Sequence, residues 1–262
     1  MNFAGALKFL NYKLFSRHGK GHGINSPFIF SIVSGVFRNK IDPLVVLKVE
    51  DIRKKNLSDS RTINIHDLGA GSLRMRDNSR KVSDITRYSS VPCKYGILLA
   101  NMAAAFGKPA IIEFGTSLGI SSMYMASGCP DALVYTMEGC PETARIAQEN
   151  FDISGLKNIT LMKGSFDDLL PEIKALNLNP GLVFIDGNHR KEPLLKYFRV
   201  ISDSAGSETV MIIDDIHSSG EMESAWRSIK QNEDVSFTID IYRMGMVFFR
   251  RGINHIDYII RY

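Results

Sequence analysis

Cysteine is scarce in this chain of 262 residues: there are three, Cys93, Cys129 and Cys140. Their number is odd and no two of them form a Cys-x-x-Cys pair, which argues against both a disulfide framework and a cysteine zinc site. A reducing compartment suits such a chain best, so we predict a cytoplasmic protein.

Long apolar runs are also missing. No stretch approaches the roughly 18 apolar residues that a membrane-spanning helix needs. The N-terminal segment MNFAGALKFLNYKLF is interrupted by Lys8 and Lys13 and has no small-residue cleavage site, so it is a poor signal peptide. We predict no membrane span, and we expect instead a helix packed on its own domain through Phe3, Leu7, Leu10 and Leu14.

A strong net charge is absent as well. The formal charge is +4, with 44% hydrophobic and 23% charged residues, which is ordinary for a globular protein. The charge is uneven, because residues 1–100 are net basic and the remainder is net acidic. A basic first segment can meet an acidic substrate or nucleic acid, but clustered charge is often only a solvated face.

From Lys108 onward, strand and helix patterns alternate. Strands are predicted at Ala110–Phe114, Leu133–Glu138, Ile159–Lys163, Leu182–Asp186 and Thr209–Asp214, with helices that include Pro141–Phe151 and Lys191–Ser202. This alternation predicts an α/β fold with a parallel sheet covered on both faces. Two final apolar runs, Val235–Tyr242 and Met246–Arg250, are joined too closely for a crossover helix, so they predict an antiparallel hairpin.

The stretch Ile111–Ser122, IIEFGTSLGISS, predicts a strand, a tight turn at Gly115 and Gly119, and a helix start. Such a turn lets the backbone approach a ligand, and the helix end offers unpaired N–H groups. It is typical of a nucleotide-type cofactor site. The three-glycine dinucleotide pattern does not fit, because Ser117 occupies its middle position, and this disfavours a nicotinamide oxidoreductase.

The spacing Glu-x-Gly-x-x-x-Gly-x-Ser resembles motif I of class I S-adenosylmethionine-dependent methyltransferases, in particular the catechol and caffeoyl-coenzyme A O-methyltransferases. The resemblance implies a Rossmann-like sheet of seven mostly parallel strands that ends in the hairpin. It also implies that Glu138, closing the second strand, accepts the ribose hydroxyls. The full predicted cofactor set is Glu113, Gly115, Thr116, Ser117, Gly119, Ser121, Glu138, Gly139, Ser165, Phe166 and Asp186.

Two members of that set follow the third strand. In the family, residues at the positions of Ser165 and Phe166 bind and stack on adenine. A plain core role for Phe166 fits equally well.

Three carboxylates follow the fourth and fifth strands, in VFIDGNH and MIIDDIH: Asp186, Asp214 and Asp215. Converging carboxylates repel one another unless a cation or proton intervenes, so they form a candidate site for Mg²⁺ or another divalent ion. The resembled enzymes carry Asp-Asn on the fifth strand, whereas Asp215 replaces that Asn here. A metal-free arrangement, in which Asp186 contacts cofactor or substrate and Asp215 caps the next segment, stays open.

The candidate catalytic residues are His189 and Asp186. His189 stands three residues beyond Asp186, where the catechol enzymes place a lysine base, and imidazole can accept a hydroxyl proton. An exposed loop histidine is the alternative.

We therefore predict an S-adenosylmethionine-dependent methyltransferase (EC 2.1.1.-) that O-methylates a small hydroxylated molecule. The alternatives are a protein of this fold that binds cofactor or a partner without catalysis and, less favoured, a nucleic-acid methyltransferase. The latter enzymes carry two prolines and an aromatic residue after the acid or amide that ends the fourth strand, and in FIDGNH no proline, Phe, Tyr or Trp follows Asp186. A homodimer stays open.

For the organisation of the chain, we predict a mainly helical extension over residues 1–90, which caps the substrate side, and a methyltransferase domain over 91–262. Within the extension, Thr62–Ser72 imitates motif I through Asp67, Gly69 and Gly71. Polar residues follow it instead of an apolar helix, so we interpret it as a structured loop or lid.

Overall fold

The computed structural model describes residues 3–17, 23–65, 78–250 and 255–262. The chain divides into two compact units, which we call the middle unit, Lys40–Asn188, and the terminal unit, Met1–Asn39 with His189–Tyr262. The domain boundary predicted at residue 90 stays a prediction. The imitation motif at Asp67, Gly69 and Gly71 lies outside the described residues.

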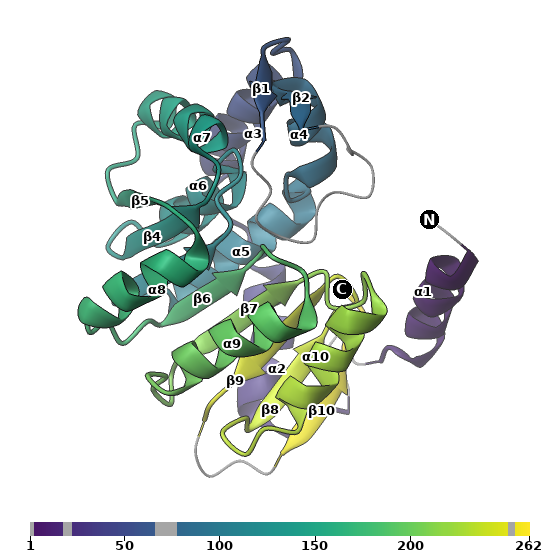
Figure 1. Cartoon of the computed structure of the whole chain (residues 1–262). Coiled ribbons are helices and arrows are strands. Elements are labelled where there is room, and N and C mark those ends of the chain that lie inside the picture. The colour runs from purple at the N-terminus through teal and green to yellow at the C-terminus, as the bar shows by residue number, and fades with distance from the viewer. Residues whose placement is uncertain (1–2, 18–22, 66–77, 251–254) are drawn as a thin grey trace. The chain divides into compact units, whose positions relative to one another are not determined.

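The middle unit contains four parallel strands: β3 (Ala110–Phe114), β4 (Leu133–Glu138), β5 (Ile159–Lys163) and β6 (Leu182–Ile185). Their order across the sheet is β6-β3-β4-β5, and Figure 1 labels β4, β5 and β6 of this group. All five residues of β3 are buried, as its apolar sequence predicts for a central strand covered on both faces. The helices that follow or precede these strands are α5 (Cys93–Phe106), α6 (Ile120–Gly128), α7 (Pro141–Ser154) and α8 (Phe166–Ala175).

Residues 40–89 add a small layer to the middle unit. It consists of α3 (Pro43–Leu57), the antiparallel pair β1 (Thr62–Asn64) and β2 (Ser79–Lys81), and α4 (Val82–Ser89). Ile63, Val82 and Ile85 from this layer form one buried cluster with Leu118 and Ile146. Burial of such side chains holds the layer against the glycine turn and α7.

The terminal unit contains β7 (Val210–Asp214), β8 (Phe237–Asp240), β9 (Met244–Phe248) and β10 (Ile256–Ile259), in the order β10-β8-β9-β7. Strand β9 runs antiparallel to both β7 and β8, which confirms the predicted C-terminal hairpin. β10 is an additional strand, parallel to β8. Most of its residues are exposed, so it lacks the buried pattern that reveals a strand in a sequence.

The helices of the terminal unit are α1 (Phe3–Phe15), α2 (Pro27–Ser34), the short 3₁₀ helix η1 (Val36–Arg38), α9 (Lys191–Ser202) and α10 (Gly220–Lys230). The predicted N-terminal helix packs through Tyr12, whose hydroxyl donates to the Ile260 carbonyl oxygen over 2.6 Å. Leu10 and Leu14, expected on its packed face, are instead exposed. The aromatic Phe9 and Tyr12, which contact Tyr242, provide that face.

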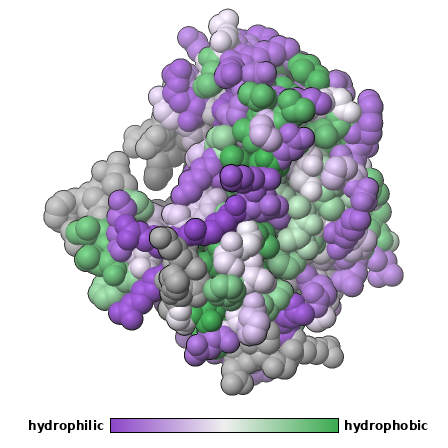
Figure 2. Space-filling model, turned by 180° about the vertical axis from the view of Figure 1, so that it is seen from behind, coloured by the Kyte–Doolittle hydropathy of each residue, from purple (hydrophilic) through white to green (hydrophobic). Residues whose placement is uncertain are grey.

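The hydropathy of the surface varies from residue to residue on the face that Figure 2 shows. On the face shown in Figure 2, hydrophilic and hydrophobic residues are intermixed. No helix among the described residues is long and apolar enough to cross a membrane.

Candidate cofactor site

The turn between β3 and α6 bends through three residues with positive φ: Gly115 (105°), Ser117 (49°) and Gly119 (81°). A side chain at Gly119 would place Cβ 2.4 Å from the Phe151 ring, and one at Gly115 would place it 2.2 Å from the Asp186 carbonyl oxygen. Both glycines are therefore required by backbone angle and by space. The Gly115 and Thr116 N–H groups donate to the Met137 carbonyl oxygen of β4, which fixes the turn to the neighbouring strand.

Glu113 lies beneath this turn and is completely buried. Its Oε2 accepts hydrogen bonds from Ser122 Oγ and from Thr136 Oγ1, and Thr136 Oγ1 lies 2.6 Å from Thr116 Oγ1. Oε1 has no partner. Burial raises the pKa of Glu113 to about 7, although the Ser122 and Thr136 hydroxyls that bind Oε2 oppose the shift. In this structure the residue supports the turn, and the direct cofactor contact predicted for it stays a prediction.

Glu138, at the end of β4, points toward the turn. Its Oε2 accepts from the Ser117 N–H over 2.8 Å, and its Oε1 accepts from the Cys140 N–H over 2.9 Å, across Gly139. The carboxylate at the end of β4 is thus held beside the glycine turn that follows β3. This is the position from which a carboxylate can accept the two hydroxyls of a ribose.

A small cavity lies over the turn. It is lined by the turn itself from Gly115 to Leu118, by Ile120 and Ser121 at the start of α6, by Ser89–Val91 and by Asp186. Asp186 follows β6, and its N–H donates to the Phe114 carbonyl oxygen over 2.8 Å. Gly115, Thr116, Ser117, Ser121 and Asp186 therefore line one cavity, with Glu138 bound to the turn beside it.

Ser165 and Phe166 begin α8. Ser165 is the N-cap, since its Oγ accepts from the Asp168 N–H over 3.1 Å and lies 2.6 Å from Asp168 Oδ2. The partly buried Phe166 ring meets Phe114 edge-on, with ring centroids 5.5 Å apart. A Cβ at Gly187 would lie 2.8 Å from Phe166, so the ring lies beside the ends of β3 and β6.

The fifth-strand acids lie in the terminal unit. Asp214 is buried, and both of its carboxylate oxygens are bound by Arg243: Nε to Oδ1 at 3.0 Å and Nη2 to Oδ2 at 2.7 Å. Asp215 adopts φ 55°, and its pKa is raised by burial and by Asp214 while Arg243 and His189 act in the opposite direction. The charge of Asp214 is thus neutralised by a bidentate guanidinium.

These contacts do not fit a divalent cation at Asp214. Arg243 already balances the charge of this carboxylate, and a cation next to Arg243 would meet like charge. Among the described residues, no three His, Cys, Asp or Glu side chains gather as a metal site. We therefore derive no step through a metal. The ligand set Asp186, Asp214 and Asp215 stays a prediction from the sequence.

His189 begins the terminal unit and is partly buried, and a protonated imidazole at this position would lower the pKa of Asp215. Sequence reasoning missed three contributors: Arg243, which pairs with Asp214, and the hydroxyls of Ser122 and Thr136 on Glu113. Arg243 lies in the turn of the C-terminal hairpin, far along the chain from Asp214, so no local pattern could join the two. Thr136 lies in β4, at the position that pairs with Glu113 of β3, so strand register could have indicated that contact.

Comparisons with known proteins agree with the fold and the motif. Residues 112–216 match a family model described as a methyltransferase domain. An O-methyltransferase of Aspergillus flavus is 30% identical over 117 residues, which cover 42% of this chain and 47% of that protein. A catechol O-methyltransferase of Mycobacterium tuberculosis is 28% identical over 129 residues, covering 48% and 57% respectively.

The solved structure of the O-methyltransferase from Bacillus cereus in complex with SAH is similar with a TM-score of 0.55 and 19% identity, covering 84% of this chain and 97% of that one. At this identity the likeness concerns the fold, and it confirms the predicted Rossmann-like α/β class. The chain spans about half the length of the curated relatives that it matches. The segment 112–216, which carries the glycine turn, Glu138 and the acids after β6 and β7, is similar to a methyltransferase domain, as the motif predicts.

Proposed function

We propose that this chain is an S-adenosylmethionine-dependent methyltransferase that O-methylates a small hydroxylated molecule. The observation that carries the proposal is the contact between Glu138 and the Ser117 N–H, which holds a carboxylate beside the glycine turn. The O-methyltransferase names of the relatives and the SAH in the similar Bacillus cereus structure support the same cofactor.

The described residues fit such a cofactor. Glu138 would hold the ribose hydroxyls, and the turn from Gly115 to Leu118 would bring backbone close to the methionine part. When bound, the cofactor supplies a methyl group already activated on a sulfonium. The protein then has to align the acceptor oxygen with that methyl group and keep water away.

An acceptor hydroxyl becomes a good nucleophile when it loses its proton. Asp186 lines the cavity over the turn, where its carboxylate would position or deprotonate the acceptor. His189 is the second candidate base, because it stands three residues beyond Asp186 in the sequence. A cytoplasmic location, and a homodimer as one option, complete the proposal as predictions from the sequence.

The test is transfer of a labelled methyl group from S-adenosylmethionine to a panel of hydroxylated acceptors. We expect incorporation by the wild-type chain and at least about a tenfold loss for Asp186→Asn, because a positioned carboxylate contributes that much or more. Arg145→Gln, on the exposed face of α7, is the matched control and should retain activity.

Silence across a broad panel, in a chain that binds S-adenosylhomocysteine, would favour the alternative of a cofactor-binding protein without catalysis. Incorporation into tRNA or DNA only would favour the nucleic-acid alternative.

A further inference from the structure

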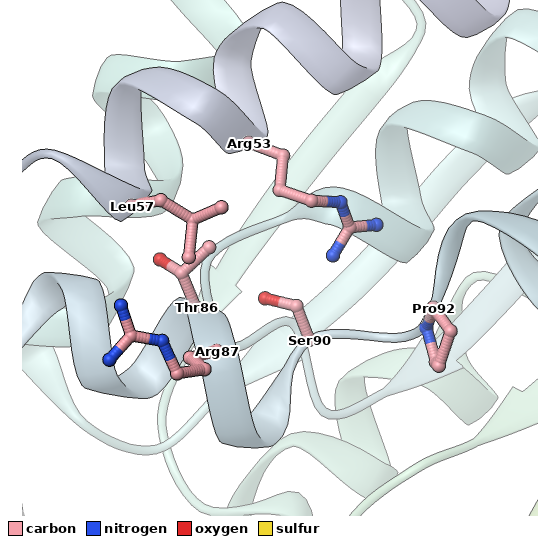
Figure 3. A pocket seen from close by; sticks show the side chains of 6 residues that line it. All are labelled: Arg53, Leu57, Thr86, Arg87, Ser90 and Pro92. Carbon is pink, nitrogen blue, oxygen red and sulfur yellow. The ribbon is translucent and has the colours of Figure 1, made fainter.

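A second cavity, of about 380 Å³, lies in the middle unit between α3, α4 and the segment leading into α5. It is lined by Arg53 and Leu57 of α3, Thr86 and Arg87 of α4, and Ser90 and Pro92 (Figure 3). We call it the arginine cavity. Its volume falls in the range of small-molecule sites.

Two of the guanidinium nitrogens of Arg53, Nε and Nη2, bind neighbouring residues and hold the side chain in place. Nε donates to both carboxylate oxygens of Glu50 at 3.0 Å, and Nη2 donates to the Val91 carbonyl oxygen at 2.7 Å. Glu50 is itself held by the Tyr124 hydroxyl at 2.8 Å. The guanidinium therefore loses little freedom when a ligand binds, which favours affinity.

The remaining polar groups of the cavity are mostly donors. Ser90 Oγ is buried and has no hydrogen-bond partner, and Figure 3 shows it between the Thr86 side chain and the Arg53 guanidinium. Arg87 is half-exposed, and its Nη1 lies 3.8 Å from Asp84 Oδ1, too far for a strong hydrogen bond. Thr86 donates its own hydroxyl proton to the Val82 carbonyl oxygen over 2.7 Å, so this hydroxyl is already engaged within α4.

The acceptors near these groups are already engaged: Glu50 holds Arg53, and Asp84 faces Arg87. The cavity is lined by two arginine side chains and the Ser90 hydroxyl, with apolar Leu57 and Pro92 beside them; in Figure 3 the Arg87 guanidinium lies on the opposite side of Ser90 from Arg53. Planar guanidinium groups bind carboxylates and phosphates in preference to neutral groups.

The arginine cavity adjoins the cofactor site, because Ser90 lines both cavities. We infer that the methyl acceptor is an acidic small molecule whose carboxylate or phosphate binds in the arginine cavity, so that its hydroxylated end faces the glycine turn. This inference rests on the proposed function and names its substrate class. The buried, unpartnered Ser90 hydroxyl would gain its missing hydrogen bond from that anion.

The test compares three probes by calorimetry, on the full chain saturated with S-adenosylhomocysteine. They are 3,4-dihydroxybenzoate, the uncharged 3,4-dihydroxybenzamide, and 4-hydroxyphenyl phosphate. We expect at least one anionic probe to bind about tenfold more tightly than the amide, since hydrogen bonds to charged groups contribute roughly 1.5–3 kcal/mol. The favoured probe identifies the anion as carboxylate or phosphate.

Arg87→Gln should abolish most of this preference, because Arg87 is exposed enough to be replaced without unfolding the chain. Ser90→Ala should reduce it as well. Arg145→Gln removes a guanidinium of similar exposure outside the cavity and should leave the preference unchanged.

Equal binding of anionic and neutral probes would overturn the inference, and so would an anion preference that survives Arg87→Gln. In either case, binding of S-adenosylhomocysteine would leave the proposed function standing. If S-adenosylhomocysteine itself does not bind, the proposed function fails, and the substrate class inferred from it fails too.

Discussion

At the scale of single residues, the most unusual group is the Glu113 carboxyl. It is buried beneath the turn, with two hydroxyls on one oxygen and none on the other. Because burial raises its pKa to about 7, the folded chain binds this proton more tightly than the unfolded chain does. The stability that the proton contributes is present below the unfolded pKa of about 4.5 and is lost as pH rises through about 7.

Glu113→Gln tests this linkage. In the wild type, this group should lower the free energy of unfolding by roughly 3 kcal/mol at most between pH 4.5 and 7.5. Glu113→Gln removes the ionisation and should flatten that fall, as urea denaturation at a series of pH values would measure. Glu172→Gln, at an exposed position of α8, is the control and should keep the wild-type slope. An unchanged slope in Glu113→Gln would show that the carboxyl is ionised throughout.

At the scale of elements, the turn between β3 and α6 depends on its glycines. Gly119 combines φ 81° with a Cβ position 2.4 Å from the Phe151 ring, whereas Gly155, which ends α7 at φ 71°, has nothing within 4 Å of its Cβ position. Replacement by alanine would therefore strain the backbone at both glycines, but only at Gly119 would the new Cβ also clash with a neighbouring side chain.

Gly155→Ala should cost about 1 kcal/mol of unfolding free energy, from the left-handed backbone alone. Gly119→Ala should cost about 2 kcal/mol more, because the Phe151 ring or the turn must also move. Thermal denaturation of both variants measures the difference. Equal losses would mean that the Phe151 ring yields without cost and that the turn is not closely packed there.

The β7–β9 pair provides another prediction at this scale. Arg243, in the turn between β8 and β9, binds both carboxylate oxygens of Asp214. The Asp214 carboxylate should therefore not need a divalent ion to balance its charge. We expect dialysis against EDTA to leave methyl transfer within about twofold of the untreated protein, a change smaller than the loss of a metal-activated nucleophile. Activity that disappears with EDTA and returns with Mg²⁺ would instead support the metal site that the sequence predicts.

At the scale of the whole molecule, the sequence predicted the alternating part of the chain well. The five strands predicted between Ala110 and Asp214 agree within one residue with their observed ends, because short apolar runs such as Ala110–Phe114 are bounded by glycine or acidic residues. The sequence also placed Glu138 beside the turn, because parallel strands bring their carboxyl ends to one edge of the sheet.

The remainder depends on contacts distant along the chain, which periodicity does not encode. Arg53 reaches the carbonyl of Val91, and Arg243 reaches Asp214, only after folding. The arginine cavity combines side chains from two helices and from the segment that leads into α5, so no motif marks it. β10 escaped prediction because an exposed edge strand has no buried face to impose a pattern.

The central claim is that a sulfonium nucleoside binds at the glycine turn with its ribose held by Glu138. Calorimetric titration of S-adenosylhomocysteine into the wild type and into Glu138→Ala tests it most directly, with NAD as a comparison ligand. We expect binding to the wild type, weakened about 30-fold or more in the variant, since charge-assisted hydrogen bonds to both ribose hydroxyls are lost. Equal affinity in the two chains, or tighter binding of NAD than of S-adenosylhomocysteine, would contradict the claim.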